Sequence, residues 1–384
     1  MNQKSFMKNP RVAWLLTSAF YYWQPSMSGY SKLFPNTTVF TSRWHGFAPG
    51  LEDSFQVDLV GNRKVIPVKK STTSYGDNFT YLPLKIVNRL LQFRPNLIFS
   101  NSFGLWTVLS ILLKPIGRWQ VVIAYEGSSV GVDYRNSPLR LALRRFMVWV
   151  ADACITNSHA GKVYLTEILK AKENQVFVHP YEVPCLQSLG KPQSKSDSDQ
   201  PLTFLFVGGI IPRKGLRYLL EACALLQQQG KTNYQLLIVG DGSQRPELET
   251  FCREQQLTDC VCWVGPVAYS KLASYFSQAD VFVLPTLEDT WGMVVLEAMV
   301  FARAVLCSQW AGASELVSDG KNGYCFDPKQ PEQLAELMKH LIDNPELVNA
   351  MGQRSRQLMN HYTPEAAATF LSRVTSFVLQ PQSK

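Results

Sequence analysis

The second half of the chain alternates short apolar runs with longer amphipathic stretches. Apolar runs of about four to seven residues are typical of strands buried on both faces, as in parallel sheets, and the longer stretches between them are typical of helices. This alternation predicts a doubly wound α/β domain. The predicted strands are 203–209, 234–240, 260–265, 280–285, 304–308 and 323–327, and the predicted helices lie at 216–229, near 245–255, 269–278 and 293–302, and from Gly312 onward.

The first half carries a similar but less regular pattern. The opening segment, Met1–Trp23, has the basic start and apolar run of a signal peptide, but no A-x-A-like cleavage site follows, so a first buried strand is the favoured interpretation. The last 55 residues have helical patterning and no further strand. The strand candidates of the first half are 12–20, 37–42, 96–102, 119–127, 153–158 and 175–181, and its helix candidates lie near 82–93, 104–114 and 139–150.

A polar segment rich in Pro, Gly and Ser separates the two halves and is typical of a linker. Ligands of doubly wound sheets bind at the carboxyl ends of the strands, so we expect two such domains to face each other across a ligand-binding cleft. The predicted boundaries are 1–183 for an N-terminal domain, 184–201 for the linker, 202–360 for a C-terminal domain, and 361–384 for a C-terminal helix that we expect to pack back on the N-terminal domain.

Charge is distributed unevenly along the 384 residues. Residues 1–200 carry 23 Lys and Arg against 12 Asp and Glu, whereas residues 201–384 carry 15 against 18. A basic half favours an anionic partner such as a membrane surface or a phosphorylated acceptor, although an ordinary solvated surface remains an alternative. The segment 139–150 (LRLALRRFMVWV) is either an interfacial helix with Arg140, Arg144 and Arg145 among its apolar residues, or a core helix with one charged face.

Composition excludes several classes of protein. A hydrophobic fraction of 46% and nine Trp exclude a mainly disordered chain. No apolar run reaches the roughly 18 residues of a transmembrane helix. The eight Cys form no CxxC pair and show no zinc-site spacing, so we expect free, buried thiols, no metal site and a cytoplasmic location.

The segment 207–222 (VGGIIPRKGLRYLLEA) joins a predicted strand to a helix. The strand ends at Gly208-Gly209, the loop carries Arg213 and Lys214, and the helix begins after Gly215. Two cations beside the amides of a helix start suit a diphosphate, although an exposed loop with incidental charges is the alternative. The spacing matches neither a P-loop nor a dinucleotide fingerprint.

Two further strand ends carry candidate residues. The next strand ends in a Gly240-Asp241-Gly242 turn, where glycines allow a tight bend and the close approach of a ligand. In PTLEDTWGMVVLEAM (285–299), Asp289 lies in a loop and Glu297 lies inside an apolar helix, where a carboxylate needs a partner. A carboxylate can hold vicinal hydroxyls, and helix-start amides can hold an anion; these amides belong to Trp291, Gly292 and Met293. A buried salt bridge for Glu297 and a helix cap for Asp289 remain alternatives.

These segments resemble the donor domain of retaining glycosyltransferases of family 4, which have the GT-B fold. That family carries a G-R-x-x-x-x-K-G loop, a V-G-x-G turn and an E-x7-E motif followed by E-A-M-A-x-G. The matching stretches run from Gly209 to Gly215, from Gly240 to Gly242, and from Asp289 to Glu297 with Ala298-Met299 behind it. The segment ADACITNS (151–158) resembles the end of the family's first domain. The resemblance implies two Rossmann-like α/β domains, with the acceptor on the N-terminal side.

The resemblance also implies roles for single residues. Lys214 would bind the donor diphosphate, Glu297 the ribose hydroxyls, and Asp289 with the amides at 291–293 the donor sugar. The backbone near Val264-Gly265 would face the base, beside the glycines of the two turns. The family's loop arginine falls on Gly209 here, so Arg213 would replace it, and the first acid of E-x7-E is an Asp.

The first half departs further from the family pattern. The family's histidine after the strand in VVIAYEG corresponds to Tyr125 and Glu126, and Glu126 either faces the cleft as a catalytic-site residue or is an exposed loop acid. The glycine pair after the first strand is missing, and Ser28-Gly29 is its nearest equivalent at the first helix.

The resemblance implies metal-independent, retaining transfer of a sugar from a nucleotide-diphospho-sugar to a hydroxyl of a glycan or lipid-linked acceptor, in polysaccharide or glycolipid synthesis. No cofactor is expected beside the donor, and no nucleic acid. The enzyme would work in the cytoplasm, at the inner face of an anionic membrane. Two alternatives stay open: a nucleotide-sugar epimerase of the same fold, and a catalytically weak or inactive sugar- or nucleotide-binding protein.

Overall fold

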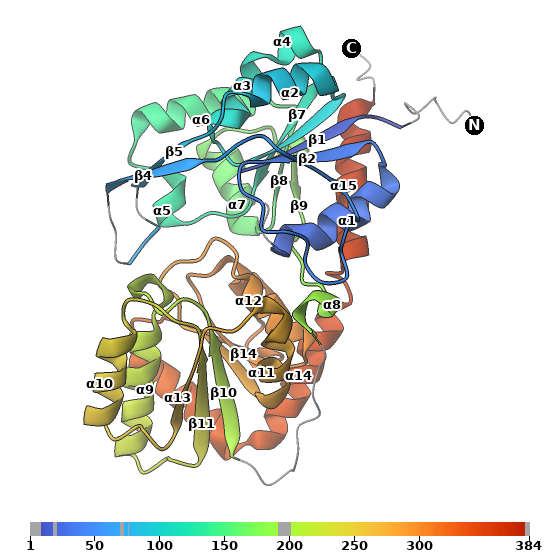
Figure 1. Ribbon diagram of the computed structural model, residues 1–384. Coiled ribbons are helices and arrows are strands. Elements are labelled where there is room, and N and C mark those ends of the chain that lie inside the picture. Colours follow the sequence, from blue (N-terminus) through green and yellow to red (C-terminus); the bar gives the residue numbers. More distant parts are fainter. Residues whose placement is uncertain (1–8, 18–20, 70–72, 76, 191–200, 381–384) are drawn as a thin grey trace. The chain divides into compact units, whose positions relative to one another are not determined.

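The computed structural model describes residues 9–17, 21–69, 73–75, 77–190 and 201–380, which form two compact units (Figure 1). Much of the predicted linker, residues 191–200, lies outside the described residues. The first unit holds Met1–Lys70, Gly76–Val183 and Tyr362–Lys384, and the second holds Ser71–Tyr75 and Pro184–His361.

A parallel seven-stranded sheet forms the centre of the first unit. Its strand order is β3-β2-β1-β6-β7-β8-β9, so the direction of winding reverses between β1 and β6, as in doubly wound sheets. A separate antiparallel pair, β4 (Lys64–Lys69) and β5 (Asp77–Tyr81), lies outside this sheet. The strands of the main sheet are β1 (Val12–Leu16), β2 (Thr37–Thr41), β3 (Gln56–Leu59), β6 (Leu97–Asn101), β7 (Gln120–Tyr125), β8 (Ala153–Thr156) and β9 (Val176–Val178).

The sheet separates two hydrophobic layers, because alternate side chains of a strand point to opposite faces. On β1, Ala13 and Leu15 belong to one layer, and Val12, Trp14 and Leu16 belong to the other. The described helices of this unit are α1 (Gln24–Leu33), α2 (Ile86–Phe93), α3 (Leu105–Leu112), α4 (Lys114–Gly117), α5 (Val130–Asp133), α6 (Pro138–Val150), α7 (His159–Val163) and α15 (Pro364–Leu379).

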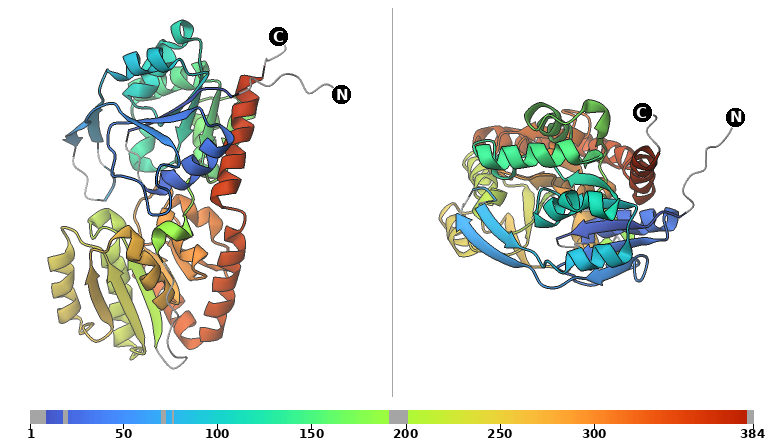
Figure 2. Two further views of the ribbon diagram at one scale, coloured as in Figure 1. Left: turned by 45° about the vertical axis from the view of Figure 1, so that its right-hand side comes forward. Right: turned by 90° about the horizontal axis from the view of Figure 1, so that it is seen from above.

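The C-terminal helix α15 packs beside α1 on one face of this sheet (Figure 2). The hydroxyls of Tyr30 on α1 and Thr375 on α15 lie 2.7 Å apart. A Cβ at Gly29 would lie 3.0 Å from Cβ of Ala368 and 3.1 Å from the carbonyl of Pro364, so a glycine suits this helix crossing. Ser28 and Gly29 therefore lie inside α1, at a packing contact, and the expectation that they supply the amides of a helix start is wrong.

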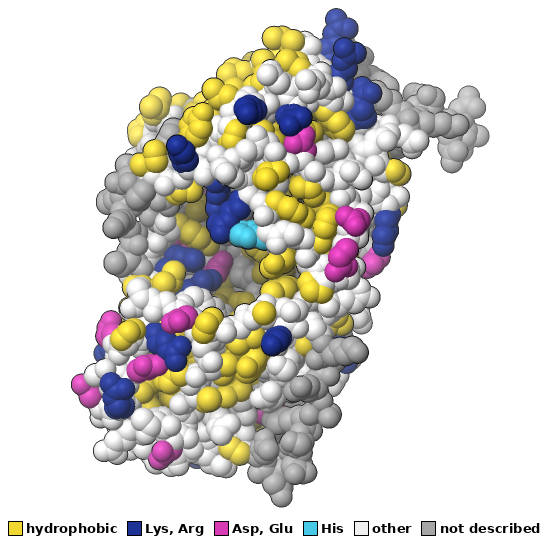
Figure 3. Space-filling view, viewed as in Figure 1, with side chains coloured by type: hydrophobic (Ala, Val, Ile, Leu, Met, Phe, Trp, Pro, Cys, Tyr) yellow, Lys and Arg dark blue, Asp and Glu magenta, His cyan; other side chains and the backbone are white. Residues whose placement is uncertain are grey.

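Helix α6 exposes an apolar stripe, formed by Leu139, Leu143, Phe146 and Trp149, with 82%, 45%, 43% and 79% of each residue exposed. Their spacing places them on one helix face. Figure 3 shows hydrophobic side chains, in yellow, gathered over the part of the first unit that holds α2, α3 and α6. The expectation that three arginines group on this surface is wrong for one of them. Arg144 is buried, and its guanidinium donates a hydrogen bond of 2.8 Å to the Tyr164 hydroxyl. Arg140 and Arg145 remain beside the stripe.

A parallel six-stranded sheet forms the second unit. Its order is β12-β11-β10-β13-β14-β15, so the direction of winding reverses between β10 and β13. Every predicted strand of the second half is present. They are β10 (Leu202–Val207), β11 (Tyr234–Val239), β12 (Val261–Gly265), β13 (Val281–Leu284), β14 (Ala304–Ser308) and β15 (Gly323–Phe326), and the helices are α8 (Leu186–Leu189), α9 (Leu216–Gln228), α10 (Arg245–Glu254), α11 (Leu272–Gln278), α12 (Met293–Val300), α13 (Pro331–Asp343) and α14 (Pro345–Met359).

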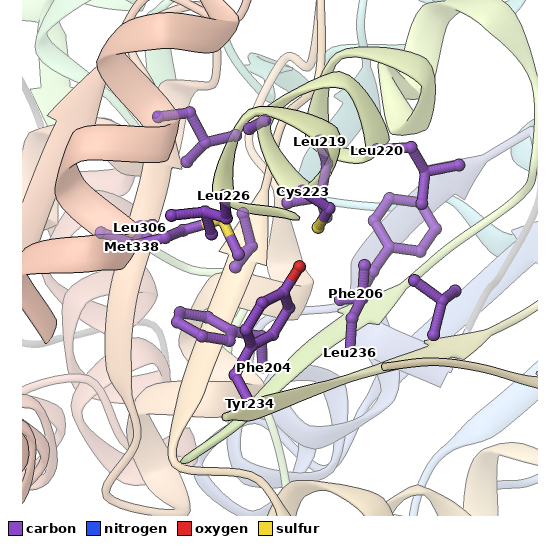
Figure 4. Close-up of a cluster of buried hydrophobic side chains, with 14 of the residues drawn as sticks. Phe204, Phe206, Leu219, Leu220, Cys223, Leu226, Tyr234, Leu236, Leu306 and Met338 are labelled. Carbon is purple, nitrogen blue, oxygen red and sulfur yellow. The ribbon is translucent and has the colours of Figure 1, made fainter. Parts of the chain in front are cut away.

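The core of this unit lies between the sheet and helices α9 and α13. In Figure 4, Phe204 and Phe206 of β10 and Leu236 of β11 point toward Leu219, Cys223 and other side chains of α9, and Met338 comes from α13.

Five of the eight cysteines are buried free thiols; Cys185 and Cys325 are half-buried. Cys262 is exposed, so the expectation of a buried residue there is wrong.

Candidate functional site

The loops that follow β10 and β13 lie at the point where the second sheet reverses its winding. Because β10 and β13 are adjacent and parallel, both loops leave the same edge of the sheet. Bound ligands of doubly wound domains lie at this point. The first loop carries Arg213 and Lys214, and the second carries Glu288 and Asp289.

The two loops contact each other through backbone groups. Gly215 adopts φ 69°, and a Cβ there would lie 1.9 Å from the carbonyl oxygen of Pro285, so a side chain would force the loops apart. The amide of Leu287 donates 2.8 Å to the carbonyl of Arg213. In return, a guanidinium nitrogen of Arg213 donates 2.6 Å to the carbonyl of Glu288. These contacts bring together residues that are far apart in sequence. Lys214 and Asp289, for example, are separated by 75 positions.

Lys214 and Asp289 form an ion pair with 2.5 Å between Nζ and Oδ2. Asp289 is only 8% exposed. Burial would raise the pKa of its carboxyl group, but Lys214, Arg213 and the backbone of Trp291 stabilise the carboxylate and hold the pKa below its usual range. The site therefore combines two cations with a carboxylate that stays ionised at neutral pH.

Glu297 lies on α12 and is 5% exposed. Burial raises the pKa of its carboxyl group to about 7, although a hydrogen bond from Tyr269 opposes this rise. The Tyr269 hydroxyl, on the short 3₁₀ helix Tyr269–Lys271, donates 3.0 Å to Oε1. The expected helix-buried carboxylate is present, and its partner is a tyrosine that no motif in the sequence indicated.

Helix α12 begins at Met293, and Gly292 precedes it with φ 94°. Trp291 is buried, its carbonyl accepts 2.7 Å from the amide of Ala313, and its indole Nε1 has no hydrogen-bond partner among the described residues. Trp291, Gly292 and Met293 therefore lie at the start of α12, where the sequence predicted a helix start.

The expected glycines differ in their surroundings. Gly240 adopts φ 138°, and a Cβ there would lie 1.9 Å from the carbonyl oxygen of Gly208. A Cβ at Gly242 would lie 2.3 Å from the carbonyl oxygen of Ile210. Gly209 has no atom within 4 Å of an added Cβ. Close packing of two loops thus accounts for Gly240 and Gly242, whereas Gly209 faces open space.

We expect Gly240→Ala to lower the free energy of unfolding by about 2–6 kcal/mol, because a strained backbone and an overpacked contact add together. Gly209→Ala is the matched control and should change it by less than about 0.5 kcal/mol. Denaturant unfolding of both variants measures this difference. Equal losses would show that the loop packing does not constrain position 240.

Val264 and Gly265 end β12, next to this turn. The amide of Gly240 donates 2.8 Å to the carbonyl of Gly265, and Gly265 adopts φ 88°. The ends of β10, β11 and β12 therefore form one continuous backbone surface beside the charged loops.

Glu126 belongs to the first unit and follows β7. The side-chain amide of Asn101 donates 3.1 Å to its Oε1, and the amide of Asn157 donates 3.3 Å to its carbonyl oxygen. It is a tethered, half-buried acid at the carboxyl end of that sheet.

Tyr75 is, after Tyr269, a second residue of this site that sequence reasoning missed. It groups with the second unit, and its hydroxyl donates 3.3 Å to Oδ1 of Asp289. No motif surrounds it in the sequence, so no local signal could have identified it.

Among the described residues, no group of three or more His, Cys, Asp and Glu side chains is arranged to hold a metal ion. None of the described helices is long and apolar enough to cross a membrane.

Comparisons with known proteins agree with this architecture. HepE of Anabaena, solved in complex with UDP and glucose, has the same fold with a TM-score of 0.68 at 16% identity, over 96% of this chain and 99% of that chain. The expected α/β fold with two doubly wound parallel sheets, as in GT-B proteins, is confirmed.

Sequence relatives match part of the chain. The chain is 32% identical over 160 residues to alpha-D-kanosaminyltransferase of Streptomyces kanamyceticus, covering 42% of this chain and 41% of that protein. It is 28% identical over 186 residues to the amylovoran biosynthesis glycosyltransferase AmsK of Erwinia amylovora, covering 46% of each. The matches thus span less than half the length of these relatives. Residues 191–358 match the family model of glycosyl transferases group 1.

Proposed function

We propose that this protein is a retaining glycosyltransferase of family 4 that moves a sugar from a nucleotide-diphospho-sugar to a hydroxyl of a glycan or lipid-linked acceptor. The observation that carries the proposal is the grouping of Arg213, Lys214 and Asp289 at the carboxyl ends of β10 and β13. The names of the relatives, which include an amylovoran biosynthesis glycosyltransferase, support a role in polysaccharide or glycolipid synthesis.

The cations would act on the donor diphosphate. As the bond between the sugar and the diphosphate breaks, negative charge develops on the leaving phosphate oxygen. Arg213 and Lys214 would stabilise this charge, so the reaction would need no metal ion. Asp289 holds the Lys214 ammonium in place before the donor binds.

The remaining groups would orient the donor. Asp289 and the amides at 291–293 would bind the donor sugar, and the Glu297 carboxylate would accept hydrogen bonds from the ribose hydroxyls. The backbone at Val264 and Gly265, with glycines 208, 209, 240 and 242, would lie against the nucleotide. The acceptor hydroxyl would attack from the face that the diphosphate leaves, and the leaving phosphate oxygen would take its proton. Glu126 would contact the acceptor or the sugar.

Thermal unfolding with UDP, GDP, ADP and their sugar conjugates tests this proposal. A nucleotide at about 100 times its Kd stabilises the folded state by about 2.7 kcal/mol, so one base should raise Tm by several degrees. Product analysis by NMR should then show an unchanged anomeric configuration. If a nucleotide binds without turnover, the protein is a binding protein, and if the sugar is altered but not transferred, it is an epimerase. A folded protein that no nucleotide stabilises would contradict the transferase and the epimerase and would favour a sugar-binding protein.

We also propose that the apolar stripe of α6 contacts the inner face of an anionic membrane. Exposed apolar patches of this kind mark interaction surfaces. Arg140 and Arg145 lie on the same helix, and the first half of the chain carries most of the positive charge. An amphipathic helix with basic and aromatic residues suits the interface of an anionic bilayer.

We expect the protein to float with vesicles that contain 30 mol% phosphatidylglycerol, and Leu139→Ser/Trp149→Ser to reduce the bound fraction severalfold. Leu186→Ser, at an exposed leucine of the second unit, is the matched control and should bind as the wild type does. Binding should weaken in high salt because screening removes the attraction of the arginines. Equal flotation of all three proteins would contradict the assignment of this surface.

A further inference from the structure

Tyr75 is bound to the charged loops of the second unit by four contacts. Its flanking strands, β4 and β5, group with the first unit, but Ser71–Tyr75 groups with the second. The Tyr75 amide donates 3.1 Å to Oε2 of Glu288, and its hydroxyl donates 3.3 Å to Oδ1 of Asp289. The hydroxyl also accepts 3.3 Å from the amide of Thr290, and the Arg213 guanidinium carbon lies 4.1 Å from the centre of its ring.

These contacts occupy the groups that the proposed reaction assigns to the donor. One oxygen of Asp289 holds the Tyr75 hydroxyl, and the other holds Lys214. The Thr290 amide, which directly precedes the amides at 291–293 proposed to bind the sugar, is directed to the same hydroxyl. The face of the Arg213 guanidinium packs on the aromatic ring of Tyr75, although this group is proposed to contact the diphosphate of the donor.

The chemistry of a phenol explains why this side chain fits. A tyrosine hydroxyl donates one hydrogen bond and accepts others, as a sugar hydroxyl does. Burial and the neighbouring Asp289 carboxylate raise the pKa of the phenol well above its ordinary value, so the hydroxyl keeps the proton that it donates. A guanidinium also binds an aromatic face, so the ring satisfies the cation where a phosphate is absent.

We propose that Tyr75 is a self-ligand: it occupies the donor-sugar position of the unliganded protein, and the nucleotide-sugar must displace it to bind. This inference rests on the proposed function. It predicts that the apparent affinity for the donor is lowered by the fraction of molecules in which Tyr75 is docked. Removing the side chain should therefore tighten binding, which is the opposite of what removal of a donor-binding residue does.

Calorimetric titration of UDP, GDP and ADP and their glucose conjugates into four proteins tests this: wild type, Tyr75→Ala, Tyr75→Phe and Tyr81→Ala. Tyr81 lies on β5 with 43% of its surface exposed and is the matched control. We expect Tyr75→Ala to bind about tenfold more tightly than the wild type if nine-tenths of the molecules are docked. Tyr75→Phe keeps the ring and loses the hydrogen bonds to Asp289 and Thr290, so its affinity for the donor should lie between those of the wild type and Tyr75→Ala. Tyr81→Ala should match the wild type.

The unliganded Tm provides a second readout, because Tyr75→Ala loses contacts only in the absence of donor and should melt at a lower temperature. If Tyr75→Ala does not fold, as judged by circular dichroism, Tyr75→Phe decides the question. Unchanged affinity in the Tyr75 variants would overturn the self-ligand, and weaker binding would make Tyr75 a donor-binding residue instead. If no nucleotide binds any of the four folded proteins, the proposed function itself fails, and the self-ligand fails with it.

Discussion

Lys214→Ala should lower kcat of the proposed transfer reaction about 100- to 1,000-fold and remove most of the nucleotide-induced rise in Tm. The magnitude is that of deleting one preorganised group that stabilises transition-state charge. Lys214 is the cation that pairs directly with the buried Asp289, so its loss removes positive charge from the proposed diphosphate position and leaves a carboxylate there. Steady-state kinetics and thermal unfolding with and without nucleotide measure the two effects.

A loss of activity could also come from instability, because breaking a buried ion pair costs about 3–5 kcal/mol. The double variant Lys214→Ala/Asp289→Asn separates the two causes. It removes the unpaired carboxylate, so the unliganded stability should return toward that of the wild type while the response to nucleotide stays absent. Lys214→Arg keeps the charge and should retain part of the response. Full activity of a stable Lys214→Ala variant would exclude this lysine from catalysis.

Donor binding should strengthen about tenfold between pH 6 and pH 8, because the Glu297 carboxyl group has its pKa raised to about 7. Ribose hydroxyls need the ionised carboxylate as acceptor, and this form becomes dominant as the pH rises through 7. In the unliganded protein the sign is reversed: the folded state holds the proton more tightly than the unfolded state, so this group's contribution to stability is lost as the pH rises through 7. Titration with a nucleotide-sugar measures the affinity, since its diphosphate has no terminal phosphate that ionises near pH 6.

Glu297→Gln is the control for this pH dependence. It should weaken donor binding roughly a hundredfold at pH 8, since hydrogen bonds to a charged group are worth about 1.5–3 kcal/mol each, and its affinity should not vary with pH. Tyr269→Phe removes the hydrogen bond that lowers the pKa of Glu297, so the rise in affinity should move to higher pH. A wild-type affinity that does not vary between pH 6 and pH 8 would contradict the ribose-binding role.

The sheet of the second unit was predictable because its strands are buried on both faces and therefore appear as continuous apolar runs. The run 304–308 corresponds to β14 residue for residue. β3 (Gln56–Leu59) escaped prediction because it is an edge strand with exposed and half-buried residues, so it carries no such run. The burial of Arg144 was equally invisible, since its partners Tyr164 and Asp133 come from other elements.

The sequence by itself determined which residues could carry the chemistry: two adjacent cations after one strand, and an acid after another with a second acid inside the following helix. Only the tertiary structure decided that Lys214 and Asp289 are paired, that Gly240 is packed against Gly208, and that Tyr75 and Tyr269 bind the two acids. The physical reason is range. Hydrophobic period and turn chemistry act over a few residues, whereas burial, pairing and the resulting pKa shifts arise between groups that meet only after the sheets have formed.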